Sequence, residues 1–421
     1  MARTFHGEKQ VRQLGESLIC LFAMVPTNEM DVIIVLDEGE KGAEMARCLL
    51  TLAEKFKFKG LRVALEAIPA SERAEKFHLF TGKLEEPFSP GKDRSQYSNF
   101  VADRYTNANI IGFFDAETCF QVPVLLSYIA RDDSSGGRGG RALHNLAEAG
   151  GSSWGVDDRA LGCTTVVDVM WPNRFPLFFW REDLQNVRSH LAVKWGGPDA
   201  CFDTAFANVT HGQSTKGYLH PRGSAHTAPF GFSQFNIIAN YVFYWQPQKY
   251  VWHVPTVDLQ GFKDRLAISL LSSQSTSSAL PTYVNNFTFK TAAEYLGRLS
   301  YEPTIAIGMN SVSTQHTLHY SCCRLHPDLH CTAAPSPNKW ERMYTLGYNP
   351  LESVANREWT KEPSAAFDEY MEAGEEFTKS LPADVRVAQV QCCAEHAAAR
   401  SNGKTGLLIS SEVLLECRVG T

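Results

Sequence analysis

The stretch "YTNANIIGFFDAETCF", from Tyr105 to Phe120, decides the fold class of this 421-residue chain. Its uncharged run Ile-Ile-Gly-Phe-Phe, at positions 110–114, leads directly into two acids, Asp115 and Glu117. A continuous apolar run of this kind is typical of a strand that is covered on both faces of a sheet. The sequence therefore predicts a buried strand whose end carries two carboxylates.

Strand-like and helix-like segments alternate around this stretch. "DVIIVLDEG" (31–39) predicts a strand, and "LRVALEAIP" (61–69) predicts another that is closed by a proline. "KGAEMARCLLTLAEKF" (41–56) and "QYSNFVADRYT" (96–106) carry apolar residues at helical spacing. This order predicts an α/β fold with a mixed, mostly parallel sheet flanked by helices.

Acidic residues close two of the predicted strands. Asp37 and Glu38 end one strand, and Asp115 and Glu117 end another, so all four are expected at the sheet edge where such folds bind ligands. Two acids one residue apart cannot readily flank a sugar on opposite faces, as glycosidase carboxylates do. Their oxygens can instead share Mg²⁺ or Mn²⁺, which in turn holds phosphate oxygens. A solvated acidic turn is the alternative interpretation.

The segment "QYSNFVADRYTNANIIGFFDAETCF" (96–120) resembles the helix, strand and D-x-D segment of nucleotide-sugar glycosyltransferases with the GT-A (Rossmann-like) fold. The resemblance covers about residues 3–255. Asp115-Ala116-Glu117 stands in place of the commoner Asp-x-Asp, and Glu offers the same oxygen ligand on a side chain longer by a methylene. "RTFHGEKQVRQLGESLICLF" (3–22) resembles the end of a first strand and the following helix, so we expect that part of that strand, and any anchor, precedes this chain.

The resemblance implies a set of site residues. Asp115 and Glu117 are expected to hold Mn²⁺ or Mg²⁺, and Asp115 thereby contacts the nucleotide-diphosphate sugar, a UDP-sugar by preference. Asp37, Gln96 and Asp103 are expected to bind the nucleotide, with buttressing of the site as the alternative for Asp103.

The acceptor side is expected within "HTAPFGFSQFN" (226–236), where Gln234 and His226 are the candidate catalytic residues. Similar sequences often carry Glu at the Gln234 position, and an acid there is an obvious general base for an acceptor hydroxyl. Since Gln cannot take a proton, the base lies elsewhere, the transfer retains configuration, or the chain is a weak catalyst. A late histidine often completes the metal shell in GT-A enzymes, and His319 is the candidate, with His316 as the alternative.

The chain is expected to have two parts. Residues 1–331 are expected to form the catalytic domain, with a flexible Gly/Ser-rich insertion at about 131–153. Residues 332–421 are expected to form a helical extension packed on the same domain. The insertion contains "GGRGGR" (136–141), which is either a solvated loop or a short RNA-binding patch.

Bulk properties limit the partners. With a net charge of -6, the chain gives no electrostatic reason to expect a nucleic-acid partner. No run reaches the ~18 apolar residues of a membrane span, so none is expected in this chain. The acceptor is expected to be a glycan, glycoprotein or glycolipid. Eleven cysteines and two N-x-S/T sequons leave the compartment open: the Golgi or ER lumen is favoured if an anchor precedes the chain, and the cytoplasm otherwise.

The expected function is a metal-dependent glycosyltransferase. One alternative is a sugar nucleotidyltransferase, although "HGEKQVRQLG" (6–15) is a poor version of its phosphate loop. A second is a catalytically weak GT-A-like module that binds a glycan or partner, which Glu117 and Gln234 favour. A structural zinc site in "STQHTLHYSCCRLHPDLHC" (313–331) is disfavoured because the two C-x2-C arms of a reliable zinc module are absent.

Overall fold

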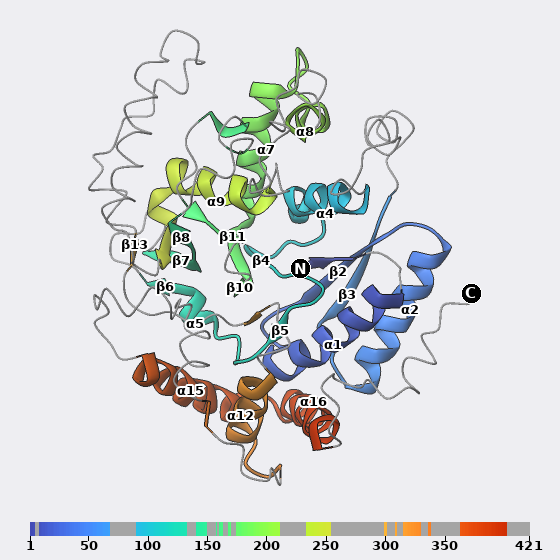
Figure 1. Ribbon diagram of the computed structural model, residues 1–421, viewed down its shortest axis with the longest axis vertical. Helices are drawn as coiled ribbons and strands as arrows, with labels where there is room; N and C mark the ends of the chain where they lie inside the picture. Colours follow the sequence, from blue (N-terminus) through green and yellow to red (C-terminus); the bar gives the residue numbers. More distant parts are fainter. Residues whose placement is uncertain are drawn as a thin grey trace, which may run out of the picture.

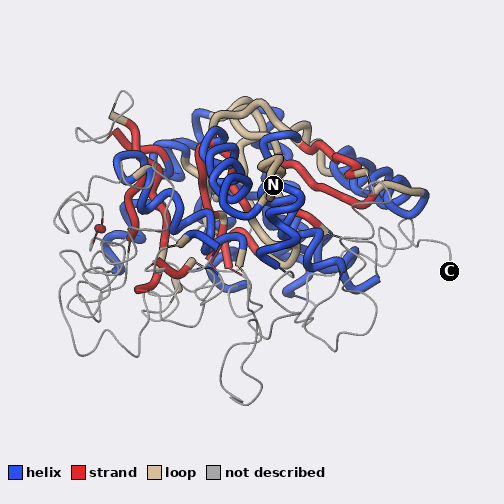
Figure 2. The backbone as a smooth tube through the Cα atoms, turned by 90° about the horizontal axis from the view of Figure 1, so that it is seen from above, coloured by secondary structure: helices blue, strands red, loops and turns tan. Residues whose placement is uncertain are grey.

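The computed structural model has helices packed around a mixed sheet, with further small sheets beside it (Figure 1, Figure 2). The structure describes residues 1–4, 8–67, 90–132, 140–149, 157, 160–162, 167–169, 174–210, 233–253, 299–300, 308–309, 315–329, 336–337 and 363–401.

Three parallel strands form one half of the main sheet: β1 (Ala2–Arg3), β2 (Val32–Asp37) and β3 (Leu61–Glu66). They are neighbours in this order, with Ala2 opposite Ile34. The apolar residues of β2 are buried without interruption, as expected for a strand covered on both faces.

The main sheet continues through β4 (Ile110–Phe113) on the other side of β1. The backbone N–H of Phe114 donates to the carbonyl of Met1 over 3.0 Å, and the amine of Met1 donates to the carbonyl of Gly112. These two bonds form the slanted pattern of a parallel pair. β11 (Leu177–Trp180) then pairs antiparallel with β4. The order β3-β2-β1-β4-β11 confirms the predicted α/β class.

Helices cover both faces of this sheet. They are α1 (Glu8–Met24), α2 (Glu40–Lys55), α4 (Pro90–Phe100), α7 (Arg181–Trp195) and α9 (Gln234–Trp245). Gly42 of α2 lies against Leu65, whereas Ser98 of α4 bonds to the next residue of the strand, Glu66. Since successive side chains of a strand point to opposite faces, α2 and α4 cover opposite faces. Right-handed crossovers place α1 on the α2 face.

The remaining elements form smaller units. One antiparallel sheet has the strand order β10 (Arg174–Phe175), β14 (Gly308–Met309), β5 (Cys119–Phe120). A second sheet has the strand order β13 (Leu299–Ser300), β12 (Tyr250–His253), β7 (Arg141–Leu146), β6 (Ala130–Asp132). β8 (Glu148–Ala149) pairs with β9 (Val167–Asp168). Short helices are η1 (Ala102–Arg104), α5 (Leu126–Ile129), α8 (Phe202–Thr210) and η3 (Pro247–Lys249).

The segment expected to be a flexible insertion, 131–153, contains strands. β7 lies between β6 and β12, and its Leu143 is fully buried. Asn145 of β7 exchanges two hydrogen bonds of 2.8 Å with the backbone of Phe178 in β11. The interpretation as a flexible loop is therefore wrong for residues 141–149, because a partly buried strand follows directly on the glycines that dominate the composition. Residues 133–139 and 150–153 lie outside the described residues.

Helices near the C-terminus pack against the sheet unit. α12 (Gln315–Leu325), α15 (Pro363–Ser380) and α16 (Ala383–Ser401) lie together in the lower part of Figure 1, and α16 packs on α1. A disulfide between Cys322 and Cys393 joins α12 to α16, and Cys48 and Cys323 each take part in a disulfide as well. Among the described helices, none has both the length and the apolar content needed to cross a bilayer.

His190 on α7 is a buried histidine whose ionisation opposes folding. A ring nitrogen lies 3.1 Å from the carbonyl oxygen of Leu161, and the ring packs against Tyr241 and Trp245 of α9. Burial lowers its pKa from 6.5 to about 4. The neutral form is therefore favoured in the folded chain, whereas the unfolded chain takes up a proton already near pH 6.5.

This difference predicts a loss of stability in acid. Above about pH 6.5 His190 is neutral in both states and costs no stability. As the pH falls from 6.5 towards 4, its protonation in the unfolded chain lowers the free energy of unfolding by up to about 3 kcal/mol. We expect His190→Gln to be less stable than the parent at pH 7 but to show a smaller fall in unfolding free energy between pH 7 and pH 4.5 in urea titrations. Equal falls in both proteins would contradict the assignment. Burial also lowers the pKa of His326 to about 4. The unfolding free energy of the variant should therefore still fall in acid, but by less than that of the parent.

Candidate functional site at the carboxyl edge of the parallel strands

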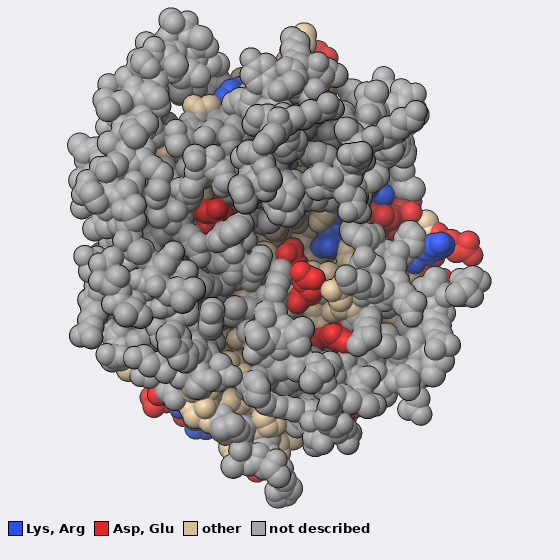
Figure 3. Space-filling model, in the orientation of Figure 1, with Lys and Arg blue, Asp and Glu red and all other residues tan. Residues whose placement is uncertain are grey.

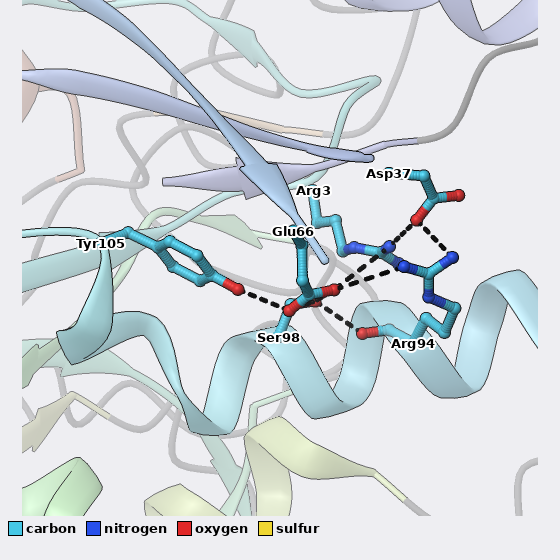
Figure 4. A network of polar contacts seen from close by, with 6 residues as sticks. All are labelled: Arg3, Asp37, Glu66, Arg94, Ser98 and Tyr105. Carbon is cyan, nitrogen blue, oxygen red and sulfur yellow. Dashed lines mark hydrogen bonds and ion pairs between the residues drawn. The ribbon is translucent and has the colours of Figure 1, made fainter. Parts of the chain in front are cut away.

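Charged side chains meet where β1, β2 and β3 end. Asp37 stands opposite Glu66 in the register, and Arg3 stands opposite Val35. Because side chains alternate along a strand, Arg3, Asp37 and Glu66 point to the same face of the sheet, the one that α4 covers (Figure 4). We call these three residues, together with Arg94, Ser98 and Tyr105, the edge cluster.

Two guanidinium groups neutralise two carboxylates in the edge cluster. Arg3 contacts the Oδ1 atom of Asp37 and lies 3.3 Å from Glu66. Arg94 of α4 lies 2.7 Å from the same Oδ1 atom and 4.0 Å from Glu66. The side chain of Arg3 is 0% exposed, so its charge depends on these acids for compensation. Burial lowers the pKa of Arg3, and the charges of Glu66 and Asp37 oppose that effect.

Hydroxyl groups complete the surroundings of Glu66. The single hydroxyl of Ser98 lies 2.9 and 2.8 Å from the two carboxylate oxygens of Glu66, and Tyr105 donates to Oε1 (Figure 4). Burial and the adjacent Glu66 charge raise the pKa of Tyr105 far above its usual value. The phenol therefore stays protonated and remains a donor at neutral pH.

The edge cluster keeps hydrogen-bond donors that the protein does not use. The Nε and Nη1 atoms of Arg3 and the Nη2 atom of Arg94 are buried, and within the described part of the chain they have no hydrogen-bond partner. Unsatisfied buried donors are costly, and guanidinium groups bind phosphate well. The arrangement therefore retains capacity for an anionic group at this edge.

The predicted metal ligands lie in a turn that follows β4. The N–H of Asp115 donates to Thr118 Oγ1, and the N–H of Thr118 donates to the Asp115 carbonyl, both over 3.0 Å. Glu117 is exposed and accepts a 3.2 Å hydrogen bond from Gln13 of α1. Ser17 of α1 donates to the carbonyl of Thr118. We call residues 115–118 the acidic turn. On the face drawn in Figure 3, acidic side chains gather near the centre, with a basic side chain beside them.

The acidic turn offers a donor set that fits Mg²⁺ or Mn²⁺. These ions are usually held by one or two protein carboxylates together with phosphate oxygens and water, and Asp115 and Glu117 supply two carboxylates. His319, the expected third ligand, lies on α12 with its ring nitrogens 3.9 Å from the sulfur of Cys323. Where the structure is described, no three His, Cys, Asp or Glu residues group closely enough to hold a metal, so His319 does not join the two acids there.

Asp103 lies on η1 and is engaged by α7. Arg188 contacts both carboxylate oxygens, one of them over 2.9 Å, and Gln185 donates to Oδ2 over 3.1 Å. Burial alone would raise the pKa of Asp103, but the hydrogen bonds and charge of Arg188 outweigh it and lower the pKa. These contacts favour the buttressing alternative for Asp103, since protein donors already occupy both oxygens.

The other predicted residues are only partly placed. Gln96 lies on α4 and is buried. Gln234 is the first residue of α9 and is also buried, next to Ser233, whose side chain caps the helix by accepting from the N–H of Asn236. His226 lies outside the described residues.

A cavity of about 530 Å³ runs from the first residues of β2 and β4 along β4 to Phe114. Its walls are mostly apolar and include Leu21, Ile33, Phe114 and Phe178. None of the predicted site residues lines it, although Phe114 directly precedes Asp115.

Sequence reasoning missed most of the edge cluster. Glu66 ends β3 in the same way that Asp37 ends β2, and this parallel was a usable signal. Arg3 and Arg94 carried no such signal, because their pairing depends on the register of β1 and on where α4 crosses the sheet.

Comparisons with known proteins identify no family. No protein-family model matches the chain, and no curated protein matches it.

The edge cluster predicts a large stability cost when its buried cation is removed. Arg3→Met leaves Asp37 and Glu66 with one guanidinium instead of two, so we expect a loss of about 3 kcal/mol or more in unfolding free energy. Arg62→Met is the matched control, because the Arg62–Asp31 pair on the same sheet is exposed and should contribute less than about 1 kcal/mol. Similar losses in the two variants, measured by urea unfolding, would show that the buried pairing is not important for stability.

Proposed function

We propose that the protein is a metal-dependent glycosyltransferase of GT-A type, which transfers a sugar from a nucleotide-diphosphate sugar to a hydroxyl of an acceptor. The observation that carries the proposal is the position of Asp115-Ala116-Glu117 directly after β4, which is paired in parallel with β1. Ligands of parallel sheets bind beyond the carboxyl ends of the strands. The acidic turn and the edge cluster therefore face the same ligand-binding edge.

Asp115 and Glu117 would hold Mn²⁺ or Mg²⁺. When bound, such an ion offsets the negative charge that develops on a leaving diphosphate. The hydrogen bonds from Gln13 and Ser17 orient the acidic turn on α1 and so limit the freedom of its two carboxylates.

The edge cluster would serve the nucleotide. Arg3 and Arg94 both contact Oδ1 of Asp37, and the Asp37 side chain is 20% exposed. The exposed part of this carboxylate can accept a hydrogen bond from a ribose hydroxyl or a base. The unused N–H groups of the two arginines are suited to the phosphate end of the same ligand.

A second candidate function is a GT-A-like module that binds a glycan or partner with little catalysis. Gln234 favours it, because a buried amide cannot accept the proton of an acceptor hydroxyl. The two candidates share a nucleotide and metal site and differ in turnover.

The disulfide between Cys322 and Cys393 supports a secretory-pathway location such as the Golgi or ER lumen, since disulfides persist in oxidising compartments. Such a location is suited to a glycan, glycoprotein or glycolipid acceptor. It gives a nucleic-acid acceptor no support.

The metal site is tested by thermal unfolding with UDP and with GDP. We expect at least one of them to raise Tm in Mn²⁺ and neither to do so in EDTA, because a ligand that binds only the folded state stabilises it. Asp115→Asn should abolish the increase. Asp132→Asn is the matched control, because Asp132 is an exposed acid whose described ion pair is with Arg141 on the neighbouring strand. An equal increase in EDTA would exclude the metal bridge.

Turnover separates the two candidate functions. For a transferase, Asp115→Asn should reduce metal-dependent hydrolysis of a sugar nucleotide by roughly a thousandfold, since the lost stabilisation of the transition state is several kcal/mol. Metal-dependent nucleotide binding without hydrolysis or transfer from any common sugar nucleotide would favour the binding module.

A further inference from the structure

Helix α1 contacts the acidic turn and the start of β5 through successive side chains. Three residues of α1 lie at spacings of four and three, which places them on one face of the helix. They meet three consecutive residues after β4, in the pairs Gln13 with Glu117, Ser17 with Thr118, and Cys20 with Cys119. The third contact joins two sulfur atoms.

In the structure Cys20 and Cys119 are both free cysteines whose sulfur atoms lie 2.6 Å apart, a distance longer than the ~2.05 Å of a disulfide bond but within reach of one. Cys20 is buried on α1, and Cys119 is half-buried at the start of β5. Helix α1 packs directly on β5, which carries Cys119. We propose that Cys20 and Cys119 form a disulfide that fastens the acidic turn to α1.

The chemistry is thiol–disulfide exchange with a small disulfide oxidant. The sulfur of Cys119, the more accessible partner, attacks one sulfur of the oxidant, forms a mixed disulfide and releases one thiol. The sulfur of Cys20 then attacks Cys119 and releases the second thiol. Two cysteine thiols are oxidised, one disulfide is reduced to two thiols, and the two cysteine protons pass to the released thiols.

Other cysteines of the chain already form disulfide bonds. Cys322 and Cys393 are joined, which implies an oxidising environment for the folded chain. Cys201 is an exposed free cysteine and supplies an internal reference for a cysteine outside any bridge.

The disulfide would connect positions 99 residues apart and would limit movement of the turn that carries Asp115 and Glu117. This consequence for metal binding rests on the proposed function, whereas the disulfide itself does not.

Peptide mapping tests the bond directly. The folded protein is incubated with oxidised glutathione, alkylated without reduction and digested with trypsin. Cys20 is the single cysteine of residues 13–41, and Cys119 is the single cysteine of residues 105–131. We expect these two peptides to be recovered as one linked species that separates on reduction.

The Cys322–Cys393 bond controls for successful oxidation, since it links residues 299–324 to residues 387–400. The first of these segments also contains the disulfide-bonded Cys323, so this linked species carries the partner peptide of Cys323 as well. Recovery of that linked species together with separately alkylated Cys20 and Cys119 would overturn the proposal.

Thermal unfolding gives a second measurement. Cys119→Ser should lower Tm by several degrees relative to the parent in oxidised glutathione, and this difference should largely disappear in a reducing agent, which opens the bridge in the parent as well. Cys20→Ala should behave in the same way and guards against a local effect of the serine. Cys201→Ser is the matched control and should leave Tm unchanged in both conditions. If the difference in Tm between Cys119→Ser and the parent is equally large in the reducing agent, the serine disturbs packing, and the proposed disulfide is contradicted.

The Mn²⁺ concentration needed for nucleotide binding tests the disulfide and the proposed function separately. If the disulfide orders a metal-binding turn, the oxidised parent should need less Mn²⁺ than Cys119→Ser for half of the UDP-dependent or GDP-dependent increase in Tm. A linked peptide without any Mn²⁺ effect would support the disulfide and count against the metal site. The reverse result would support the metal site and overturn the disulfide.

Discussion

The buried guanidinium of Arg3 is the interaction on which the carboxyl edge of the sheet depends. β1 has two residues in the structure, yet it lies between β2 and β4 and so joins the two halves of the main sheet. Arg3 ends this strand between two acids that would repel each other without it. Arg94 brings α4 to the same point. The last residues of three strands and one helix are thus held together by charge compensation.

This compensation has a chemical consequence. Buried charges are tolerated when they are paired and hydrogen-bonded. In the edge cluster the Glu66 carboxylate has hydroxyl partners, whereas some N–H groups of the two arginines have no partner among the described residues. An edge with satisfied acids and unsatisfied cationic donors is suited to an anionic ligand. The function that we propose assigns a cation to the acidic turn. Under that proposal, the two together would be complementary to a diphosphate bound with a divalent ion.

The acidic turn and the edge cluster are held from opposite faces of the sheet. α1, on one face, binds the turn through Gln13 and Ser17, and α4, on the other, supplies Arg94 and Ser98 to the edge cluster. Asp103 ties η1, which follows α4, to α7. The candidate site therefore lies between helices that are anchored separately, and this gives its carboxylates defined positions before any ligand binds.

The sequence by itself determined the local elements: the apolar run of β2, the helical spacing of α2 and the acids that end β2 and β4 all follow from the periodicity and polarity of neighbouring residues. Only the tertiary structure decided the partners. Asp37 meets Arg3 and Arg94, Asp103 meets Arg188, and β7 lies in a sheet although glycines precede it. The physical reason is that strand register and helix crossing set these contacts, and both depend on residues far apart in the chain.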